Sequence, residues 1–342
     1  MRSQNQSGKF QGPLRSVVIL ARECFGDAIM LTPLIAALKQ RHPETAIYIV
    51  AFRQIIFDFF SSDANVTAVY HAKRDLKRYF LKFWPKRYDV VFNSKDHRST
   101  SFLMQSRIIR ARYKVGYRNN GNEQLFDYLL DMPAGTHESQ RNFALLKAID
   151  GEMPGTTGPY IPEMPVSKEV AGLLDAMPQG SYIGINISVG TPGGHRTFEQ
   201  WSDLIRSFPD ERFVIFSSPG DIETKRKLEA PHPNVLATPT TRNLYEVWKI
   251  VDRLKLLVTP DTSLVHVAAC SDRPLVALYR FNPADSRLFA PLSTQQEVIV
   301  SPTPDVVDIE NAVVTDAVRK MLESLASQAP FPIAEQKNRG SH

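Results

Sequence analysis

Small polar residues stand where an apolar run typical of a buried strand gives way to a helical pattern. The segment TPDTSLVHVAAC, residues 259–270, follows the apolar run LKLLV. Asp261, Thr262 and Ser263 fall where the helix is expected to begin, and His266 lies one turn further on. A cap from Asp261 or Thr262 explains one of these residues. The open end of a helix also presents unpaired N–H groups and partial positive charge, which suit a phosphate.

The segment ARECFGDAIM, residues 21–30, has the same strand–loop–helix pattern. Gly26 permits a tight turn or the close approach of a ligand. Asp27 falls at the carboxyl end of the first expected strand, where a carboxylate suits a general base. A plain helix cap at Asp27 is the simpler alternative.

Two further loops follow expected strands. The glycine-rich segment NISVGTPGGHRTFEQW, residues 186–201, carries His195 and Arg196, and flexible backbone with cations suits a diphosphate. The segment SSPGDIE places Asp221 after a strand, where an acidic side chain accepts ribose hydroxyls. A mobile surface loop and a simple helix cap are the corresponding structural alternatives.

Apolar runs alternate with helical patterns along the chain, which predicts parallel sheets with helices on both faces. The segment 151–168 is rich in proline and glycine and separates two such halves as a linker. We therefore expect two α/β domains, with the ligand site between them at the carboxyl ends of the strands. The expected strands are 16–21, 46–52, 66–71, 89–94, 182–188, 213–218, 254–259 and 274–279, and the expected helices are 27–42, 98–111, 198–208, 220–230, 243–253 and 308–326.

The composition is that of a globular protein, with 342 residues, 43% hydrophobic and 23% charged. Cys24 and Cys270 form no metal or disulfide pattern, which favours a reducing, cytoplasmic compartment. The net charge of +5 is uneven, because the segment 73–87 interleaves lysine and arginine with aromatic residues. Such a segment suits an anionic membrane surface or nucleic acid, and a solvated amphipathic helix is the structural alternative.

Several motifs are absent from the sequence. It contains no Asp-x-Asp pair of the kind that many metal-dependent sugar transferases use, and no phosphate-binding P-loop. It also lacks the Gly-x-Gly-x-x-Gly and Gly-x-Ser-x-Gly signatures. These absences disfavour ATP hydrolysis, dinucleotide redox chemistry and serine hydrolysis.

Taken together, four blocks of the sequence resemble the ADP-heptose:lipopolysaccharide heptosyltransferases of glycosyltransferase family 9. They are VVILARECFGDAIMLTPLIAALKQRHP, HESQRNFALLKAIDG, GINISVGTPGGHRTFEQWSDLI and TPDTSLVHVAACSDRPLVALY, and they occur in the family's order. Two stretches depart from the family pattern. The third block reads Gly-His-Arg-Thr at 194–197 where a basic residue and Trp-Pro are common, and 280–282 read Arg-Phe-Asn instead of Gly-Pro-Thr.

The resemblance implies an α/β protein of the GT-B fold, in which two Rossmann-like domains with parallel sheets face each other across a cleft. Residues 1–160 would bind the acceptor and residues 161–330 the nucleotide sugar. The terminal helix 308–326 would pack back on the N-terminal domain, and 331–342 would be a tail.

The resemblance also implies an enzyme: an inverting, metal-independent transferase that moves heptose from ADP-heptose to a lipopolysaccharide core acceptor, Kdo or heptose. It needs no cofactor, no metal and no nucleic acid. We expect a cytoplasmic protein held peripherally at the inner membrane, where its acceptor is an anionic, lipid-linked saccharide. The alternatives are the same fold with another nucleotide sugar or acceptor, a nucleotide-sugar epimerase, and a non-enzymatic two-domain solute-binding protein.

The site residues follow from the matched motifs and the loops above. Asp27 is the expected catalytic base. The expected diphosphate ligands are Thr262, Ser263, Leu264, Arg196 and His195. The donor sugar or nucleotide is assigned to Asp261, His266, Asp221, Asn186 and Ser188, and the acceptor to Gly26, Lys95, Arg98 and Arg118.

Overall fold

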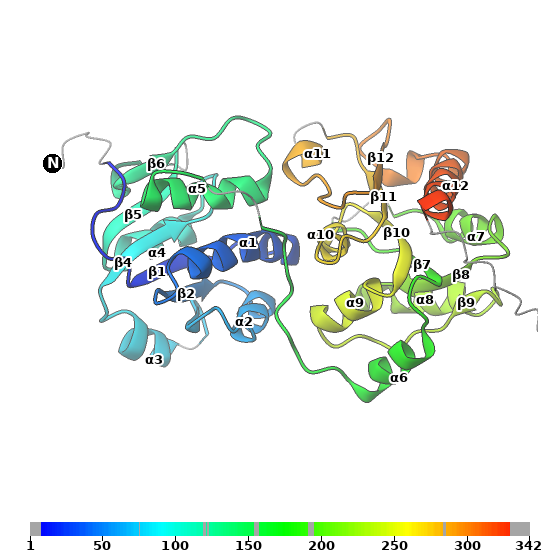
Figure 1. Cartoon of the computed structure of the whole chain (residues 1–342), viewed down its shortest axis with the longest axis horizontal. Helices are drawn as coiled ribbons and strands as arrows, with labels where there is room; N and C mark the ends of the chain where they lie inside the picture. The colour runs from blue at the N-terminus through cyan, green and yellow to red at the C-terminus, as the bar shows by residue number, and fades with distance from the viewer. Residues whose placement is uncertain are drawn as a thin grey trace, which may run out of the picture.

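Each of the two lobes in the computed structural model is built on one six-stranded sheet (Figure 1). All strand pairs among the described residues are parallel. The structure describes residues 8–74, 76–118, 121, 123–153, 157–190, 195–282 and 285–328.

The first lobe has its strands in the spatial order β3-β2-β1-β4-β5-β6. These strands are β1 (Ser16–Leu20), β2 (Ala46–Ala51), β3 (Ala68–His71), β4 (Tyr88–Asn93), β5 (Ala111–Tyr117) and β6 (Tyr128–Leu130). Its helices are α1 (Phe25–Arg41), α2 (Gln54–Ser61), α3 (Leu76–Arg78), the π-helical turn η1 (Tyr79–Phe83), α4 (Thr100–Ile108), the 3₁₀ turn η2 (Glu123–Leu125) and α5 (Glu138–Asp150).

The second lobe has the order β12-β11-β10-β7-β8-β9. Its strands are β7 (Tyr182–Asn186), β8 (Arg212–Phe216), β9 (Val235–Leu236), β10 (Leu254–Pro260), β11 (Leu275–Tyr279) and β12 (Gln296–Val300). Its helical elements are α6 (Lys168–Ala176), α7 (Phe198–Arg206), η3 (Pro219–Asp221), α8 (Ile222–Glu229), α9 (Leu244–Val251), α10 (Ser263–Ala269), α11 (Asp285–Leu288), η4 (Val306–Asp308) and α12 (Asn311–Gln328).

Both sheets follow the doubly wound topology, counted from the first strand of each lobe. The strand order reverses between β1 and β4 in the first lobe and between β7 and β10 in the second. Ligands of such sheets bind outside the carboxyl ends of the strands at this reversal. The loops that follow β1, β4, β7 and β10 are therefore the places to look for a site.

The central strands are apolar because helices cover both of their faces. Val17, Val18, Ile19 and Leu20 of β1 are fully buried, as expected for a parallel strand between two helical layers. One hydrophobic cluster includes α1 and α5 of the first lobe together with α9 and α10 of the second. The two lobes therefore share a core where α1 meets α10 (Figure 1).

The connection between the lobes has no helix or strand from 157 to 167, as the proline-rich sequence predicts. Tyr160 ties it to the first lobe, because its backbone N–H donates to Thr32 Oγ1 at 2.9 Å and its hydroxyl to Asp63. Ser167 ties it to the second lobe, since its backbone N–H donates to Glu246 at 2.7 Å.

The terminal helix does not pack as the family resemblance implied. The segment predicted at 308–326 forms α12, which contacts α7, β10, β11 and β12 of the second lobe. Its buried residues Val314, Val318 and Met321 belong to a hydrophobic cluster made by the second lobe. Figure 1 places α12 on the side of this lobe that faces away from the first. The predicted packing of this helix on the N-terminal domain is therefore wrong, because the apolar face of α12 packs against the second lobe. Among the described residues, no helix is long and apolar enough to span a membrane.

Candidate active site

Asp27 lies in the first turn of α1, directly after the carboxyl end of β1. Cys24 is the N-cap residue and makes no side-chain cap, while the Asp27 carboxylate accepts a hydrogen bond from the backbone N–H of Cys24. The simple capping interpretation therefore holds in part. Burial raises the pKa of Asp27 above its usual range, although the charges of Arg22 and Lys95 oppose this effect.

Arg22 joins Asp27 to a second buried carboxylate. Its Nε lies 3.3 Å from Asp27 Oδ1, and its Nη1 lies 2.5 Å from Glu138 Oε1 at the start of α5. Burial raises the pKa of Glu138 to about 7, against the opposing charge of Arg22. Burial disfavours the charge of Arg22 as well, but Glu138 and Asp27 outweigh it and raise its pKa. These three side chains form one electrostatic unit.

Two more ion pairs complete this edge of the first sheet. After β4, Asp96 pairs with Arg141 of α5. Burial opposes ionisation of Asp96, but nearby cations, Arg22 first among them, lower its pKa overall. Lys95 Nζ lies 2.8 Å from Glu23 Oε2, in the loop that precedes Asp27. The expected acceptor residue Lys95 thus lies beside the expected base.

The second lobe presents hydroxyl and amide groups at the matching place. Thr262 is the N-cap of α10, and its hydroxyl accepts from the backbone N–H of Leu264 at 3.3 Å. Asn186, the last residue of β7, donates to Thr259 Oγ1 at 2.9 Å and to Thr262 Oγ1 at 3.1 Å. This network bridges the reversal between β7 and β10. If a phosphate binds here, the backbone N–H of Leu264 must leave the Thr262 hydroxyl and donate to a phosphate oxygen instead.

Ser188, Asp221 and His195 meet beside this network. The Ser188 hydroxyl donates to Asp221 Oδ2, and His195 Nε2 lies 3.8 Å from Asp221 Oδ1. Burial opposes ionisation of Asp221, but hydrogen bonds from Ser188 and Ser218 and the His195 charge lower its pKa overall. Asp221 occupies the N-cap position of α8 but makes no cap hydrogen bond. The loop after β7 reaches Asp261, because a Cβ on Gly190 would lie 3.7 Å from the Asp261 carbonyl oxygen.

The two edges meet at Gly26 and His266. A Cβ at Gly26 would lie 2.9 Å from His266 Cδ2, closer than real Cβ contacts allow. The residue before Asp27 thus touches the helix that begins at Ser263. His266 is 3% exposed, and burial lowers its pKa to about 3, with a further contribution from the charge of His137. His266 is therefore neutral and packs between the lobes, so its predicted role at the donor sugar or nucleotide is corrected.

The structure contradicts the prediction for Arg196. Its guanidinium donates to the backbone carbonyl of Ile309 at 2.8 Å and to Asn311 at the start of α12, and it lies over the Trp201 ring. Only 4% of the residue is exposed, and burial lowers its pKa to about 10. Arg196 therefore anchors α12 to α7 rather than meeting a ligand. The glycine-rich residues 191–194 of the same predicted loop lie outside the described residues.

The remaining acceptor predictions lie further along the first sheet. Arg118 follows β5, and its Nε donates to Asp131 at 3.2 Å. Arg98 is exposed and packs against Gly121, where a Cβ would lie 2.9 Å from Arg98 Cγ. These contacts place both arginines on the β5 side of the edge. Neither of these described contacts involves Asp27.

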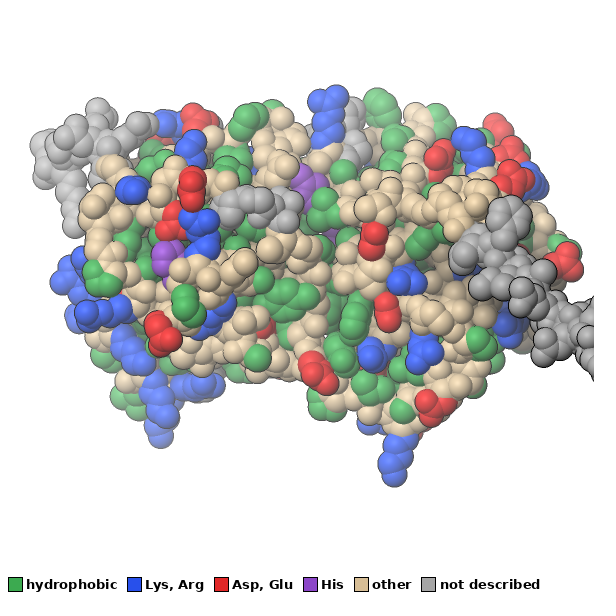
Figure 2. Space-filling model, in the orientation of Figure 1, with side chains coloured by type: hydrophobic (Ala, Val, Ile, Leu, Met, Phe, Trp, Pro, Cys, Tyr) green, Lys and Arg blue, Asp and Glu red, His purple; other side chains and the backbone are tan. Residues whose placement is uncertain are grey.

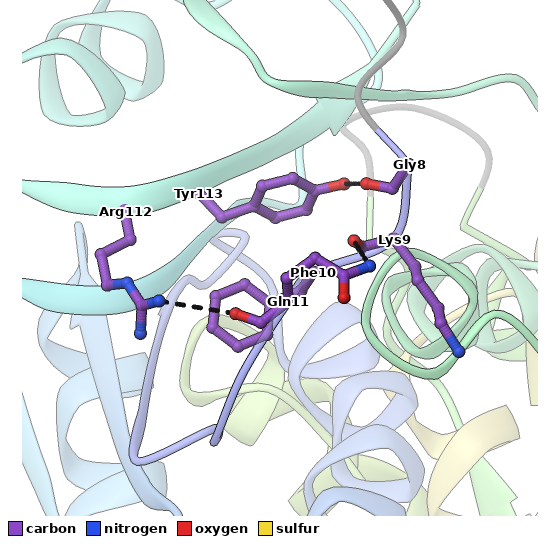
Figure 3. Close-up of a pocket in the computed structure, with 6 residues that line it drawn as sticks. All are labelled: Gly8, Lys9, Phe10, Gln11, Arg112 and Tyr113. Carbon is purple, nitrogen blue, oxygen red and sulfur yellow. Dashed lines mark hydrogen bonds between the residues drawn. The ribbon is translucent and has the colours of Figure 1, made fainter.

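A pocket of about 300 Å³ lies elsewhere, lined by Gly8, Lys9, Phe10, Gln11, Arg112 and Tyr113 (Figure 3). Arg112 and Tyr113 stand at the start of β5, so this pocket lies at the amino edge of the first sheet. It is therefore remote from the strand ends that carry Asp27. Within the described ranges, no group of three His, Cys, Asp or Glu side chains is arranged to hold a metal ion.

The comparison with known proteins agrees with the two-lobed arrangement. The family model of glycosyltransferase family 9 (heptosyltransferase) matches residues 77–314. This chain belongs to glycosyltransferase family 9. The family 9 chain is 22% identical to lipopolysaccharide heptosyltransferase 3 of Escherichia coli over 283 residues, which cover 74% of this chain and 80% of that protein.

Two solved structures show the same fold as the family 9 chain. A glycosyl transferase of family 9 from Veillonella parvula superposes with a TM-score of 0.75 at 16% identity, covering 93% of this chain and all of that one (100%). The ADP-heptose lipopolysaccharide heptosyltransferase II of E. coli gives a TM-score of 0.70 at 21% identity, covering 91% and 99%. The expected GT-B fold is confirmed. The chain is a glycosyltransferase, which excludes a non-enzymatic solute-binding protein.

Sequence reasoning missed Arg22 and Glu138 as members of the site of this family 9 enzyme. Both residues lie within the blocks that carry the family resemblance, at 22 in the first and 138 in the second. The signal available was a charged residue in the short loop between β1 and α1 and an acidic residue at the first position of α5. Only the fold shows that these two positions face each other.

Proposed function

We propose that this enzyme transfers heptose from ADP-heptose to the core saccharide of lipopolysaccharide, Kdo or heptose, with inversion and without a metal. The proposal rests on membership of family 9 and on the named activities of the relatives. Residues 1–160 bind the acceptor, and residues 161–330 bind the nucleotide sugar. The observation that carries this assignment is the contact between Gly26 and His266, which places the start of α1 against α10.

Asp27 acts as the base in this proposal. The acceptor O–H attacks the anomeric carbon, its proton passes to the Asp27 carboxylate, and the bond from that carbon to the diphosphate breaks. ADP leaves with the bonding electron pair, so one displacement inverts the anomeric centre. A raised pKa suits Asp27 for this step, because a base works best when its pKa lies nearer the working pH.

The diphosphate binds at the start of α10. The amides of Thr262, Ser263 and Leu264 meet its charge, and the half-exposed imidazole of His195 adds a hydrogen-bond donor from the side. Donors that are fixed before the reaction are usually the largest catalytic contribution, and losing one costs about 3 kcal/mol. Asp221, Ser188, Asn186 and Asp261 hold the nucleotide and sugar around this point.

The acceptor approaches over the first lobe. Lys95 lies between Glu23 and the Phe102 ring and offers its charge to the anionic groups of the saccharide. We place the enzyme in the cytoplasm at the inner leaflet of the membrane, because that is where a lipid-linked acceptor is accessible together with a nucleotide sugar.

Replacing Asp27 by asparagine tests the proposal. Asp27→Asn keeps the shape of the side chain but cannot accept the proton, so we expect transfer from ADP-heptose to fall about 10²–10⁴-fold. ADP binding, measured by calorimetry, stays unchanged. Asp58→Asn is the matched control, because Asp58 is an exposed aspartate of α2 that bonds Gln54.

Three outcomes contradict parts of this proposal. Transfer by Asp27→Asn at the parent rate removes the base assignment. Loss of transfer in a chelator, restored by a divalent cation, removes metal independence. Retention of the donor's anomeric configuration in the product, read by NMR, removes the single displacement.

A further inference from the structure

The segment from Leu76 to Arg87 forms a surface that the catalytic site does not use. We call it the 76–87 surface; it comprises α3, η1 and the turn that follows. Tyr79 and Phe83 are its two buried residues, and they pack in the core against one face of the first sheet. Every other residue of the 76–87 surface is exposed.

Large apolar side chains are concentrated on this surface. Leu76 is 47% exposed, Phe80 49%, Leu81 67% and Trp84 39%. Single exposed apolar residues are ordinary, but several within nine positions mark an interaction site. Tyr79 and Phe83 alone fix the segment to the core, so the fold does not require apolar residues at the exposed positions.

Cations surround these apolar side chains. Lys77, Arg78, Lys82, Lys86 and Arg87 lie within the same 12 residues, which contain no aspartate or glutamate. Arg110 adds to them, because its guanidinium lies over the Trp84 ring at 5.5 Å. Figure 2 shows lysine and arginine side chains gathered at the lower edge of the first lobe, where Figure 1 places α3.

We propose that the 76–87 surface docks the enzyme on an anionic lipid bilayer, with Phe80, Leu81 and Trp84 inserted among the acyl chains. The lysines and arginines then lie at the level of the phosphate headgroups. An interfacial segment of this kind combines a basic rim with apolar and aromatic side chains. Nucleic acid is disfavoured, because bases stack on aromatic rings, whereas Leu81, the most exposed of these residues, has no ring.

The positive charge continues from this surface to the catalytic edge. A hydrogen bond from Lys95 lowers the pKa of Glu23, and the charges of Lys73 and Arg53 lower it further. Lys73 lies between β3 and α3, and Glu23 lies in the loop before Asp27. A lipid-linked saccharide therefore meets cations from the bilayer to the site. This delivery of the acceptor rests on the proposed function, whereas the binding to lipid does not.

Vesicle sedimentation with the full chain tests the docking. The probes are vesicles of phosphatidylglycerol with phosphatidylethanolamine, and vesicles of phosphatidylcholine alone. We expect the parent to bind only the anionic vesicles and to be released by salt. Replacing Lys77 and Lys82 together by glutamine lowers the partition coefficient about 25-fold, at roughly five-fold for each charge. Replacing Phe80 and Leu81 by serine lowers it roughly ten-fold or more.

Matched controls use exposed residues elsewhere on the protein. Lys168→Gln with Lys227→Gln removes the same charge from α6 and α8. Leu292→Ser with Val313→Ser removes apolar side chains that are 41% and 46% exposed. Both controls are expected to bind vesicles like the parent, and circular dichroism checks that every variant is folded.

The outcomes separate this inference from the proposed function. Equal binding by the surface variants and the controls overturns the docking, as does parent binding to an oligonucleotide but not to anionic vesicles. The surface variants should lose transfer to acceptor in vesicles while keeping transfer to a delipidated acceptor saccharide. A parent that binds vesicles but transfers to neither acceptor leaves the docking intact and removes the proposed function.

Discussion

The two lobes share one strand order but carry different chemistry at the edges where they meet. The first lobe holds charged groups in its interior, with Arg22 between Asp27 and Glu138. At the start of α10 the second lobe holds neutral groups, with Asn186 donating to Thr259 and Thr262. One topology thus supports a site that controls a proton and a site that recognises an anion.

The difference has a physical reason. Desolvation raises the pKa of a buried carboxylate and a nearby cation lowers it; at Glu138 desolvation outweighs the charge of Arg22, so the pKa rises to about 7. Backbone amides at a helix N-terminus bind a phosphate with donors that do not change charge. The first edge therefore depends on pH through Glu138, whereas the amides and hydroxyls at the start of α10 do not change charge, and four predictions test this contrast.

The largest effect is expected from Arg22→Met. This change leaves Glu138 and Asp27 buried without their cation, and breaking a buried pair costs about 3–5 kcal/mol of stability. Denaturation in urea measures the loss, and transfer should fall as well. The control is Arg41→Met at a more exposed pair with Asp150, for which a loss below about 1 kcal/mol is expected. Equal losses of stability in both variants would show that the buried ion pairs of Arg22 contribute no more than the exposed ion pair of Arg41.

Glu138→Gln tests the pH dependence of the first edge. The folded-state pKa of Glu138, about 7, lies above its ordinary 4.5, so the folded protein binds this proton more tightly. Its contribution to stability is present below 4.5 and is lost as pH rises to about 7, at up to about 1.4 kcal/mol per pH unit. Glu138→Gln should flatten this decline, and the exposed Glu152→Gln should not. An unchanged slope in Glu138→Gln contradicts the assignment.

Arg196→Met separates anchoring from ligand binding in the second lobe. Removing the guanidinium leaves the Ile309 carbonyl without its donor, which costs about 1–3 kcal/mol. The affinity for ADP, measured by calorimetry, should stay at the parent value. Arg206→Met at the last residue of α7 is the control, because Arg206 is exposed. A selective loss of ADP binding in Arg196→Met would restore the original assignment.

The smallest effect is expected from Thr262→Ala. The loss of this cap costs about 1 kcal/mol, and ADP binding should weaken because the amides of α10 lose their fixed geometry. Thr197→Ala removes the cap of α7 and should cost similar stability without changing ADP binding. The same ADP affinity in both variants would argue against a phosphate at α10.

Much of the fold could be predicted because buried parallel strands are apolar throughout. The run SVVILA gives β1 to within one residue, and LKLLVT gives β10 in the same way. The sequence pattern predicts no strand at β5, because ARYKVGY mixes polar and apolar residues, and the predicted helix 98–111 ends at its first residue, Ala111. The π-helical turn η1 has no distinct sequence pattern.

The site could be predicted only where a residue type at a given position has a single common role. Asp27 and Thr262 stand at strand–helix junctions, and the fold brings those junctions together. Arg196 has the chemistry of a phosphate ligand, but its position at the base of α7 gives it to α12 instead. The pairing of Arg22 with Glu138 joins residues 116 positions apart (138 minus 22). No local pattern reports such a contact.

The placement of α12 on its own lobe has a topological consequence. Within the described part of the chain, the polypeptide passes from one lobe to the other once, through the segment that contains Tyr160. A proteolytic nick in that segment therefore yields two complete fragments instead of two interlocked ones. Their reassociation, measured as a dissociation constant, would report the adhesion between α1 and α10 separately from the tether.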